Sequence, residues 1–376
     1  MYKTGLIQLN KNTRRLWMLK EILVDGYKSI NRESVELKPF TLFSGVNSAG
    51  KSSVIQAINY VLDTQCKRST IQDDGGEAEI GRFLDVRNNI KGNKEIIFTM
   101  KEYNLQGEEF DLQVFYGGCE TSDVTRMDAP VNEQYKKYID EFKKIYLSVE
   151  RVGVQNTYDL NVHNPLNIGD KGRYAFSYLS YFGQEALKEP AFLYNPEEVG
   201  MSLNNQVNYW MDYLLGFQIR VKPIPEVDQV IAMYSNSKNN RYYRAANVGT
   251  GVTYIAILII AALSCKKGDT LIIENPEIHL HPRAQSRLME FAAFLCERGL
   301  QIIMETHSDH IYNGMRKCIK RNTLDRENIA AYYFELDETM QTEIHHISFN
   351  DQGAEENHPY GMFDQFDDDL DELIGM

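Results

Sequence analysis

The sequence predicts an α/β fold: a mixed sheet flanked by helices, with an antiparallel β-subdomain near the N-terminus and an inserted helical subdomain. The main observation is the stretch 45–52, Gly-Val-Asn-Ser-Ala-Gly-Lys-Ser, which fits the phosphate-binding pattern G-x-x-x-x-G-K-[ST]. An apolar, β-prone segment (40–44) precedes it, and a segment with helical periodicity (53–62) follows it. The second observation is that short apolar strands alternate with helices after residue 247, which indicates a parallel sheet.

The stretch 45–52 is expected to be a P-loop that binds the phosphates of ATP. Its glycines allow backbone N–H groups to face the phosphates, and the following helix adds the partial positive charge of its N-terminus. Lys51 is expected to reach the β- and γ-phosphates, and Ser52 to ligate Mg²⁺. An accidental Gly-rich turn is disfavoured because the strand and the helix are both in place. The predicted nucleotide-binding residues here are Gly45, Asn47, Ser48, Ala49, Gly50, Lys51, Ser52 and Ser53.

The N-terminal part is predicted to consist of a polar leader and an ATPase lobe. Residues 1–17 have no periodic pattern, whereas residues 18–150 contain the P-loop and several β-like segments. Two of these, 96–103 and 110–116, alternate between apolar and polar residues on either side of Gln106-Gly107. This pattern is typical of two paired antiparallel strands joined by a turn.

The rest of the chain divides into three parts. Residues 151–246 are rich in Asn and Tyr, and the helices expected at 174–182 and 206–215 make this part a helical insertion. Residues 247–349 form the predicted C-terminal ATPase lobe, and residues 350–376 an acidic C-terminal module. Within the C-terminal lobe we predict strands at 270–273, 301–304, 329–336 and 342–349, and helices at 252–264, 283–296 and 308–318.

Composition narrows the class of protein. The 376 residues allow one large domain or two modest ones, and 43% of them are hydrophobic, which is ordinary for a globular protein. The formal charge of −13 argues against a protein that coats DNA non-specifically, although it leaves room for a local basic groove. We find no apolar run near the length of a membrane span, no signal-peptide pattern and no C-x-x-C pair, so we expect a cytoplasmic protein with reduced thiols.

Two strands of the C-terminal lobe end in chemically useful residues. The apolar run Leu271-Ile272-Ile273 ends in Glu274, which has the form of a Walker B element, so Glu274 is expected to ligate Mg²⁺ together with Ser52. The second strand leads into Glu305-Thr306-His307-Ser308. Because ligands of open α/β sheets bind at the carboxyl ends of the strands, His307 is well placed to meet a γ-phosphate.

The order of these motifs resembles the ABC-class ATPase heads of the SMC and OLD type. The resemblance runs from about Leu19 to the C-terminus. It is carried by the segments 42–53, 272–282 (Ile-Ile-Glu-Asn-Pro-Glu-Ile-His-Leu-His-Pro) and 305–308 (Glu-Thr-His-Ser). The ending 358–366 resembles the short C-terminal module of one bacterial branch, whose members are often described as AAA-type ATPases of unknown function.

The resemblance implies a signature motif shortly before the Walker B strand. Residues 247–253, Asn-Val-Gly-Thr-Gly-Val-Thr, stand at that place, and Asn247, Gly249 and Gly251 are the expected contacts. In this class the signature binds the γ-phosphate of the other subunit, so that two heads enclose two nucleotides in a homodimer. The alternative is a helix N-terminus whose glycines merely allow close packing.

One position departs from the family. The family usually has a catalytic Glu directly after the Walker B acid, where this chain has Asn275, an amide that can orient water but cannot accept its proton. Glu277 can substitute if the loop bends, and His307 can hold the water. The predicted catalytic set is therefore Glu274, Asn275, Glu277 and His307, with slow hydrolysis or an ATP-locked state as open outcomes. For the Q-loop, residues 82–89 are our best assignment.

The resemblance implies an ATPase that works as a dimerising switch and controls a separate effector protein, a nuclease or toxin, in a bacterial antiphage or toxin system. A DNA-processing enzyme of the OLD or SMC type is the first alternative, disfavoured because the segment 350–376 is too short for a nuclease domain. A nucleotide-locked scaffold is the second. We expect no membrane partner and leave DNA open as a partner.

Three weaker signals remain open at this point. Arg151 follows an apolar strand and is either structural or a sensor of nucleotide. Lys238, Arg241 and Arg244 form a basic patch that is either solvated or in contact with phosphate or DNA. The histidines near the two strand ends, His279, His281, His307 and His310, are better explained by packing around the nucleotide site than by zinc.

Overall fold

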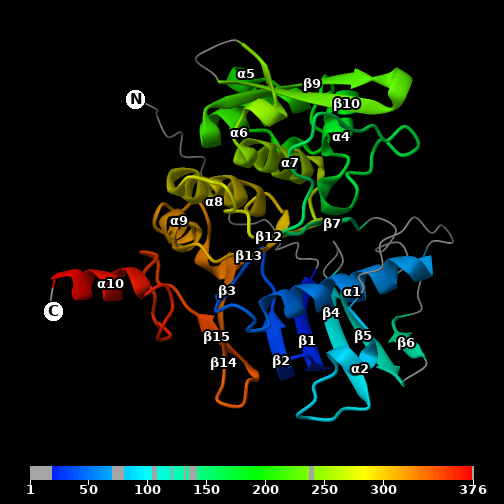
Figure 1. Ribbon diagram of the computed structural model, residues 1–376, viewed down its shortest axis with the longest axis vertical. Helices are drawn as coiled ribbons and strands as arrows, with labels where there is room; N and C mark the ends of the chain where they lie inside the picture. Colours follow the sequence, from blue (N-terminus) through cyan, green and yellow to red (C-terminus); the bar gives the residue numbers. More distant parts are fainter. Residues whose placement is uncertain are drawn as a thin grey trace.

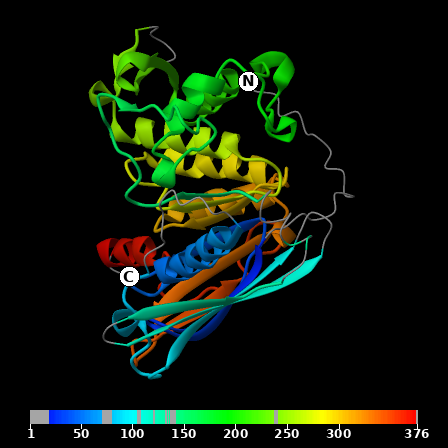
Figure 2. The ribbon, with the colours of Figure 1, turned by 90° about the vertical axis from the view of Figure 1, so that its right-hand side faces the viewer.

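The computed structural model describes residues 19–69, 80–103, 108–119, 122–130, 133, 135, 142–236 and 241–374. The predicted leader 1–17 lies outside the described residues. The described chain forms two layers of strands with α1 between them, and an upper part made of the insertion (Figures 1 and 2). No helix among these residues is long and apolar enough to cross a membrane.

The central sheet has six strands in the order β15-β14-β3-β13-β12-β7. All its neighbouring pairs are parallel except β14 and β15, which form an antiparallel hairpin. This confirms the mixed sheet predicted from the alternating strands and helices. Its strands are β3 (Phe40–Gly45), β7 (Lys144–Leu147), β12 (Thr270–Glu274), β13 (Gln301–Glu305), β14 (Ile329–Leu336) and β15 (Thr342–Ile347).

Helices cover both faces of the central sheet, which explains why its strands are continuous apolar runs. On one face, Leu271 and Ile302 belong to a core shared with α7 (Thr250–Ser264), α8 (Pro282–Cys296) and α9 (Asp309–Lys320). On the other face, Ile272 and Ile303 belong to a second core with α1 (Lys51–Ser69). Figure 2 shows α1 on the opposite side of the sheet from these three helices.

The antiparallel N-terminal β-subdomain is also confirmed. It is a five-stranded sheet in the order β2-β1-β4-β5-β6, and it packs on the far side of α1. Residues of β4 and β5 alternate between buried and exposed positions, which is the pattern of a sheet with one solvated face. The elements are β1 (Leu19–Tyr27), β2 (Ile30–Glu36), β4 (Glu95–Tyr103), β5 (Glu109–Gly118), β6 (Asp123–Asp128) and the short helix α2 (Phe83–Val86).

The insertion is not only helical, and this corrects the sequence prediction. Besides α4 (Ala175–Phe182), α5 (Pro196–Val199) and α6 (Leu203–Leu215), it contains β8 (Tyr158–Asp159), β9 (Phe217–Ile224), β10 (Gln229–Asn236) and β11 (Tyr243–Arg244) in one antiparallel sheet. Among the described residues the strand β9 pairs only with β10, and such an edge strand tolerates a proline, here Pro223. Because proline is unusual in strands, the sequence pattern did not indicate a strand at this place.

The C-terminal module begins by packing on α9. Arg316 Nε donates to Gly353 O at 2.9 Å, the rings of Tyr312 and Phe363 lie 5.2 Å apart, and Met362 is fully buried. The last helix, α10 (Gln365–Ile374), then extends away from the body (Figure 1). The described residues also form single 3₁₀ turns at Asp170–Gly172, Pro190–Phe192, Pro225–Val227, Ala245–Asn247 and Arg326–Asn328.

Candidate nucleotide-binding site

Three neighbouring strands of the central sheet bring the predicted site residues to one edge. β3 ends at Gly45, β13 at Glu305 and β12 at Glu274, and the strands are parallel. Glu274 and Glu305 are register partners, so their carboxylates stand side by side. This is the edge at which ligands of open α/β sheets bind.

The P-loop is held tightly by the hairpin β14–β15. Gly45 has φ +136°, and a Cβ added there would lie 2.1 Å from Phe334 O, which accepts the Val46 N–H at 3.0 Å. Gly50 has φ +104°, and its Cβ would lie 2.6 Å from Thr342 Oγ1. Both positions therefore require glycine, for backbone conformation and for space.

Lys51 is buried at the centre of this loop. Its side chain is 3% exposed, and Nζ donates to Gly45 O at 3.0 Å and to Val46 O at 2.6 Å. Burial lowers the pKa of Lys51, while the Glu305 carboxylate raises it. A buried ammonium held by two carbonyls of a phosphate-binding loop fits a site for an anionic phosphate.

Glu305 contacts the P-loop hydroxyl, a role that sequence reasoning did not assign. Ser52 Oγ lies 3.1 and 3.0 Å from the two Glu305 carboxylate oxygens and donates to them. Burial and the neighbouring Glu274 raise the pKa of Glu305 to about 7, against the opposing effects of Lys51 and Ser52. The sequence did contain a signal for this role, because Gln301–Glu305 is a second apolar strand that ends in a carboxylate, as β12 does.

Glu274 lies on the β7 side of the same cluster. Its Oε1 accepts the Tyr146 O–H at 2.9 Å, and its Oε2 accepts the Val149 N–H at 3.2 Å. Burial and this carboxylate raise the pKa of Tyr146 well above its usual range. The two carboxylates and the Ser52 hydroxyl are hard oxygen donors, which are the groups that fit Mg²⁺.

The loop after β12 bends at Asn275. Asn275 has φ +42°, in the left-handed region that Asn tolerates better than most residues. Its N–H donates to Glu305 O at 2.9 Å, and its carbonyl accepts from Arg151 Nη2 at 2.7 Å and from Ile278 N at 3.3 Å. The side-chain oxygen Oδ1 is buried and has no partner among the described residues.

Arg151 is a buried arginine with unused donors. It is 3% exposed, and its Nε and Nη1 have no partner in the described part of the chain. Its guanidinium lies 5.3 Å from the centre of the Tyr254 ring in α7. Burial lowers its pKa to about 10. Arg151 thus connects β7, the Asn275 loop and the helix that follows the signature segment.

The bend brings Glu277 next to the histidine. Glu277 Oε1 accepts the His307 N–H at 2.8 Å, and its Oε2 is buried without a partner among the described residues. Burial and the nearby Lys51 lower the pKa of His307, which favours the neutral imidazole. Glu274, Asn275, Glu277 and His307 therefore lie near one another and near Lys51, and their catalytic role stays a prediction.

The structure separates the two glycines of the signature segment. Gly251 is buried, and a Cβ there would lie 2.4 Å from His279 O, so this glycine serves close packing. Gly249, just before α7, is exposed and has open space where a Cβ would stand, and Asn247 is exposed as well. No hydrogen bond in the described chain joins Asn247 or Gly249 to its own P-loop.

The other histidines have structural contacts. His279 stacks on Tyr254 with 5.8 Å between ring centres, and His281 Nδ1 accepts the Arg283 N–H at 3.3 Å and caps α8.

The segment 82–89, which the sequence suggested as the Q-loop, lies against the turn between β1 and β2. Asn88 in this segment is buried and donates to Lys28 O at 2.9 Å. The Q-loop role of residues 82–89 stays a prediction.

Comparison with known proteins agrees with this geometry. Residues 18–167 and 120–312 match the family described as AAA ATPase domain, which together is most of the chain. The chain belongs to the AAA ATPase domain family. This AAA ATPase domain protein is also similar to the Old nuclease of Escherichia phage P2, with 23% identity over 393 residues. That similarity covers 87% of this chain and 64% of the phage protein's length.

Solved structures place the same AAA ATPase domain protein among SMC heads by fold. An SMC head bound to the C-winged helix domain of ScpA has a TM-score of 0.52 and 11% identity, over 88% of this chain and 98% of the other. The Smc head with an extended coiled coil, from Pyrococcus furiosus, has a TM-score of 0.54 and 12% identity, over 95% and 99% of the two chains. The resemblance to SMC- and OLD-type heads is confirmed.

Proposed function

We propose that this protein binds ATP with Mg²⁺, hydrolyses it, and works as a dimerising switch that controls a separate effector. One observation carries the ATPase part: the P-loop lysine and serine, two strand-end carboxylates and a histidine gather at one edge of the central sheet. The family match to AAA ATPase domains supports the same reading.

Each of these residues has a role in the proposed reaction. Lys51 binds the β- and γ-phosphates, and Ser52, Glu305 and Glu274 would hold Mg²⁺, which would neutralise charge on the phosphates. Glu277 accepts the proton of the attacking water, because its Oε2 has no partner among the described residues and the Asn275 amide cannot accept a proton. His307 contacts the γ-phosphate as a neutral imidazole. The products are ADP and phosphate.

The proposed dimer uses the exposed half of the signature segment. Asn247 and Gly249 lie at the N-terminus of α7 and are exposed, so they are free to meet the nucleotide of a second copy. A helix N-terminus is favourable for a phosphate, and the interface is isologous. The dimer would thus complete two sites at once.

We further propose a cytoplasmic role in antiphage defence or a toxin system, with a nuclease or toxin as the effector. The alternative is DNA processing, which the similarity to the Old nuclease favours. A nucleotide-locked scaffold is the third candidate, and the presence of Asn275 after Glu274 favours it.

Phosphate release from ATP by the purified protein separates these candidates. Turnover in wild type that is lost in Lys51→Ala supports the ATPase. Equal inactivity of both, with nucleotide still bound by wild type, supports the scaffold. Light scattering with ATP and Mg²⁺ tests the dimer, and DNA cleavage that stops with a chelator and returns with metal would favour DNA processing.

A further inference from the structure

The insertion's sheet has an outward face that the proposed ATPase does not use. Its inward face, including Val230, Ala232 and Tyr234 of β10, packs into the core over α4 and α6. Because strand side chains alternate, Met233 of β10 points outward, and its register partners are Arg220 of β9 and Arg244 of β11. The two arginines thus flank Met233 across two strand spacings, about 10 Å.

This outward face carries cations that form no ion pair with a carboxylate among the described residues. We define the basic face as Arg220, Lys222, Tyr242 and Arg244. In the described chain, none of its three cations forms a salt bridge, whereas cations elsewhere do: Lys171 with Glu150 at 2.7 Å, Lys101 with Glu21 at 2.8 Å and Arg321 with Glu290 at 3.1 Å. In a protein of net charge −13, a local cluster of unpaired cations indicates an anionic partner.

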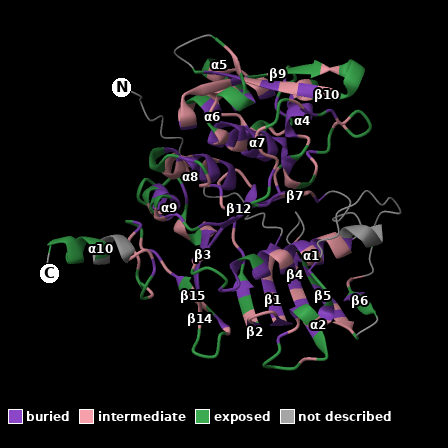
Figure 3. Ribbon diagram, viewed as in Figure 1, coloured by how far each residue is buried: buried purple, intermediate pink, exposed green. Residues whose placement is uncertain are grey.

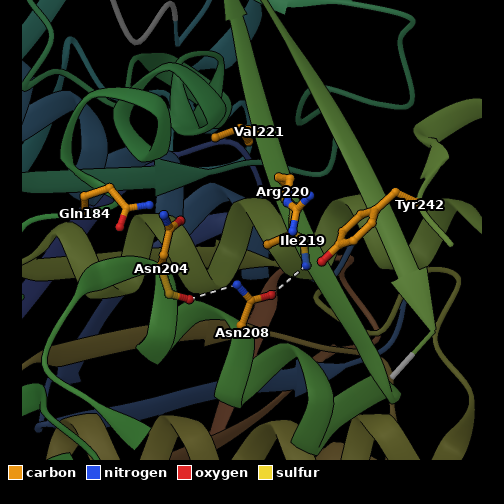
Figure 4. A pocket seen from close by; sticks show the side chains of 7 residues that line it. All are labelled: Gln184, Asn204, Asn208, Ile219, Arg220, Val221 and Tyr242. Carbon is orange, nitrogen blue, oxygen red and sulfur yellow. Dashed lines mark hydrogen bonds between the residues drawn. The ribbon is translucent and has the colours of Figure 1, made fainter. Parts of the chain in front are cut away.

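Aromatic and amide groups lie beside these cations. The Arg220 guanidinium is 4.4 Å from the centre of the Tyr242 ring. Both line a cavity of about 360 Å³ together with Gln184, Asn204, Asn208, Ile219 and Val221 (Figure 4). The side chains of Gln184 and Asn204 have no hydrogen-bond partner within the described residues, whereas both polar groups of Asn208 are used. Free amides offer a donor and an acceptor, as the edges of nucleobases require.

We propose that the basic face binds single-stranded nucleic acid and that the cavity receives a base. Lys and Arg neutralise phosphates, while a tyrosine ring and a guanidinium plane stack on unpaired bases. A duplex hides its base edges from such a cavity, and an acidic peptide would leave the ring and the amides unused. The inference goes beyond the proposed ATPase and does not depend on it.

Fluorescence anisotropy with a labelled oligothymidylate and the full-length chain tests this surface. We expect binding to the single strand to be tighter than to a duplex of the same length. Arg220→Ala and Arg244→Ala should each lower the salt dependence of binding by about one counterion. Tyr242→Ala should weaken binding by about fivefold or more, the range of one lost stacking contact, and Tyr242→Phe should restore it.

Two controls keep the result interpretable. Lys94→Ala removes an exposed cation from the N-terminal β-subdomain and should leave affinity unchanged. Lys51→Ala should also bind the oligonucleotide, so a failed ATPase leaves this proposal standing. Absence of binding, insensitivity to the double variant Arg220→Ala/Arg244→Ala, equal affinity for the duplex, or tighter binding of a polyglutamate peptide would each overturn the proposal.

Discussion

Replacing Arg151 by methionine tests how the loop after β12 is held in place. Arg151 Nη2 donates to Asn275 O at 2.7 Å from a buried position, and methionine keeps the apolar stem while removing the donor. A hydrogen bond from a charged group contributes about 1.5–3 kcal/mol. The global cost is smaller, because the substitution also removes a buried guanidinium whose Nε and Nη1 have no partners in the described chain.

The local cost falls on catalysis. Asn275 keeps its left-handed conformation against a strain of about 1–2 kcal/mol, and Arg151 is one of the contacts that hold it there. If the loop relaxes, Glu277 leaves the His307 N–H, and the proposed base is misplaced. A loss of about 1.5–3 kcal/mol corresponds to a decrease in kcat of about 10- to 150-fold. KM for ATP should change little, since Lys51 and Ser52 are untouched.

The assay is steady-state phosphate release over a range of ATP concentrations, together with urea unfolding of each variant. Arg151→Lys keeps a charged donor and should recover part of the lost kcat. Arg298→Met is a matched control. Arg298 follows the end of α8, donates to the backbone carbonyl of Phe294 and covers the Phe294 ring, so it makes the same two kinds of contact as Arg151. An unchanged kcat in Arg151→Met would refute the positioning role. A fall in kcat that is accompanied by an equal rise in KM and by a lower urea midpoint would refute it as well, because such a pattern indicates general destabilisation.

The remaining predictions concern the signature, the proposed base and pH. Gly251→Ala should destabilise the fold by about 1–3 kcal/mol, because its Cβ would meet His279 O, whereas Gly249→Ala should leave the melting temperature unchanged and reduce ATP-dependent dimerisation. Glu277→Gln should still bind ATP but lose turnover, so that the ATP-bound dimer accumulates; light scattering measures this accumulation. Burial raises the pKa of Asp269 to about 6, so this carboxyl binds more protons in the folded state than in the unfolded one. Asp269 should therefore lower the unfolding free energy by about 1–3 kcal/mol between about pH 4 and pH 6. In urea titrations of Asp269→Asn the fall should be smaller by that amount, while the contribution of Glu305, whose pKa is raised to about 7, remains.

The central sheet was predictable because burial on both faces leaves a simple pattern. Strands β12 and β13 are flanked by helices on both sides, so every residue in them is buried and the apolar runs stand out. Edge strands carry no such pattern. β9 contains Arg220, Lys222 and Pro223 and pairs with a single strand in the described part of the chain, so its sequence has the pattern of an irregular segment.

The site was predictable as a set of motifs but not as a set of contacts. P-loop and strand-end residues are local features, whereas the Ser52–Glu305 contact depends on β13 lying between β3 and β12. Sequence gives no strand order, and the resemblance directed attention to Glu274 instead. The bond from Arg151 to Asn275 spans 124 positions along the chain and could not be inferred from either residue.

The geometry around Asn275 bears on why this chain has no glutamate directly after the Walker B acid Glu274. A glutamate there would have to adopt φ near +42° and would add a third carboxylate beside Glu274 and Glu305. Burial and the neighbouring Glu274 already raise the pKa of Glu305 to about 7. Asparagine tolerates this conformation and adds no charge. The same bend brings the Glu277 carboxylate to the His307 N–H. In the proposed reaction, Glu277 is therefore the carboxylate that accepts the proton of the water, and Asn275 is the residue whose left-handed conformation turns the backbone toward it.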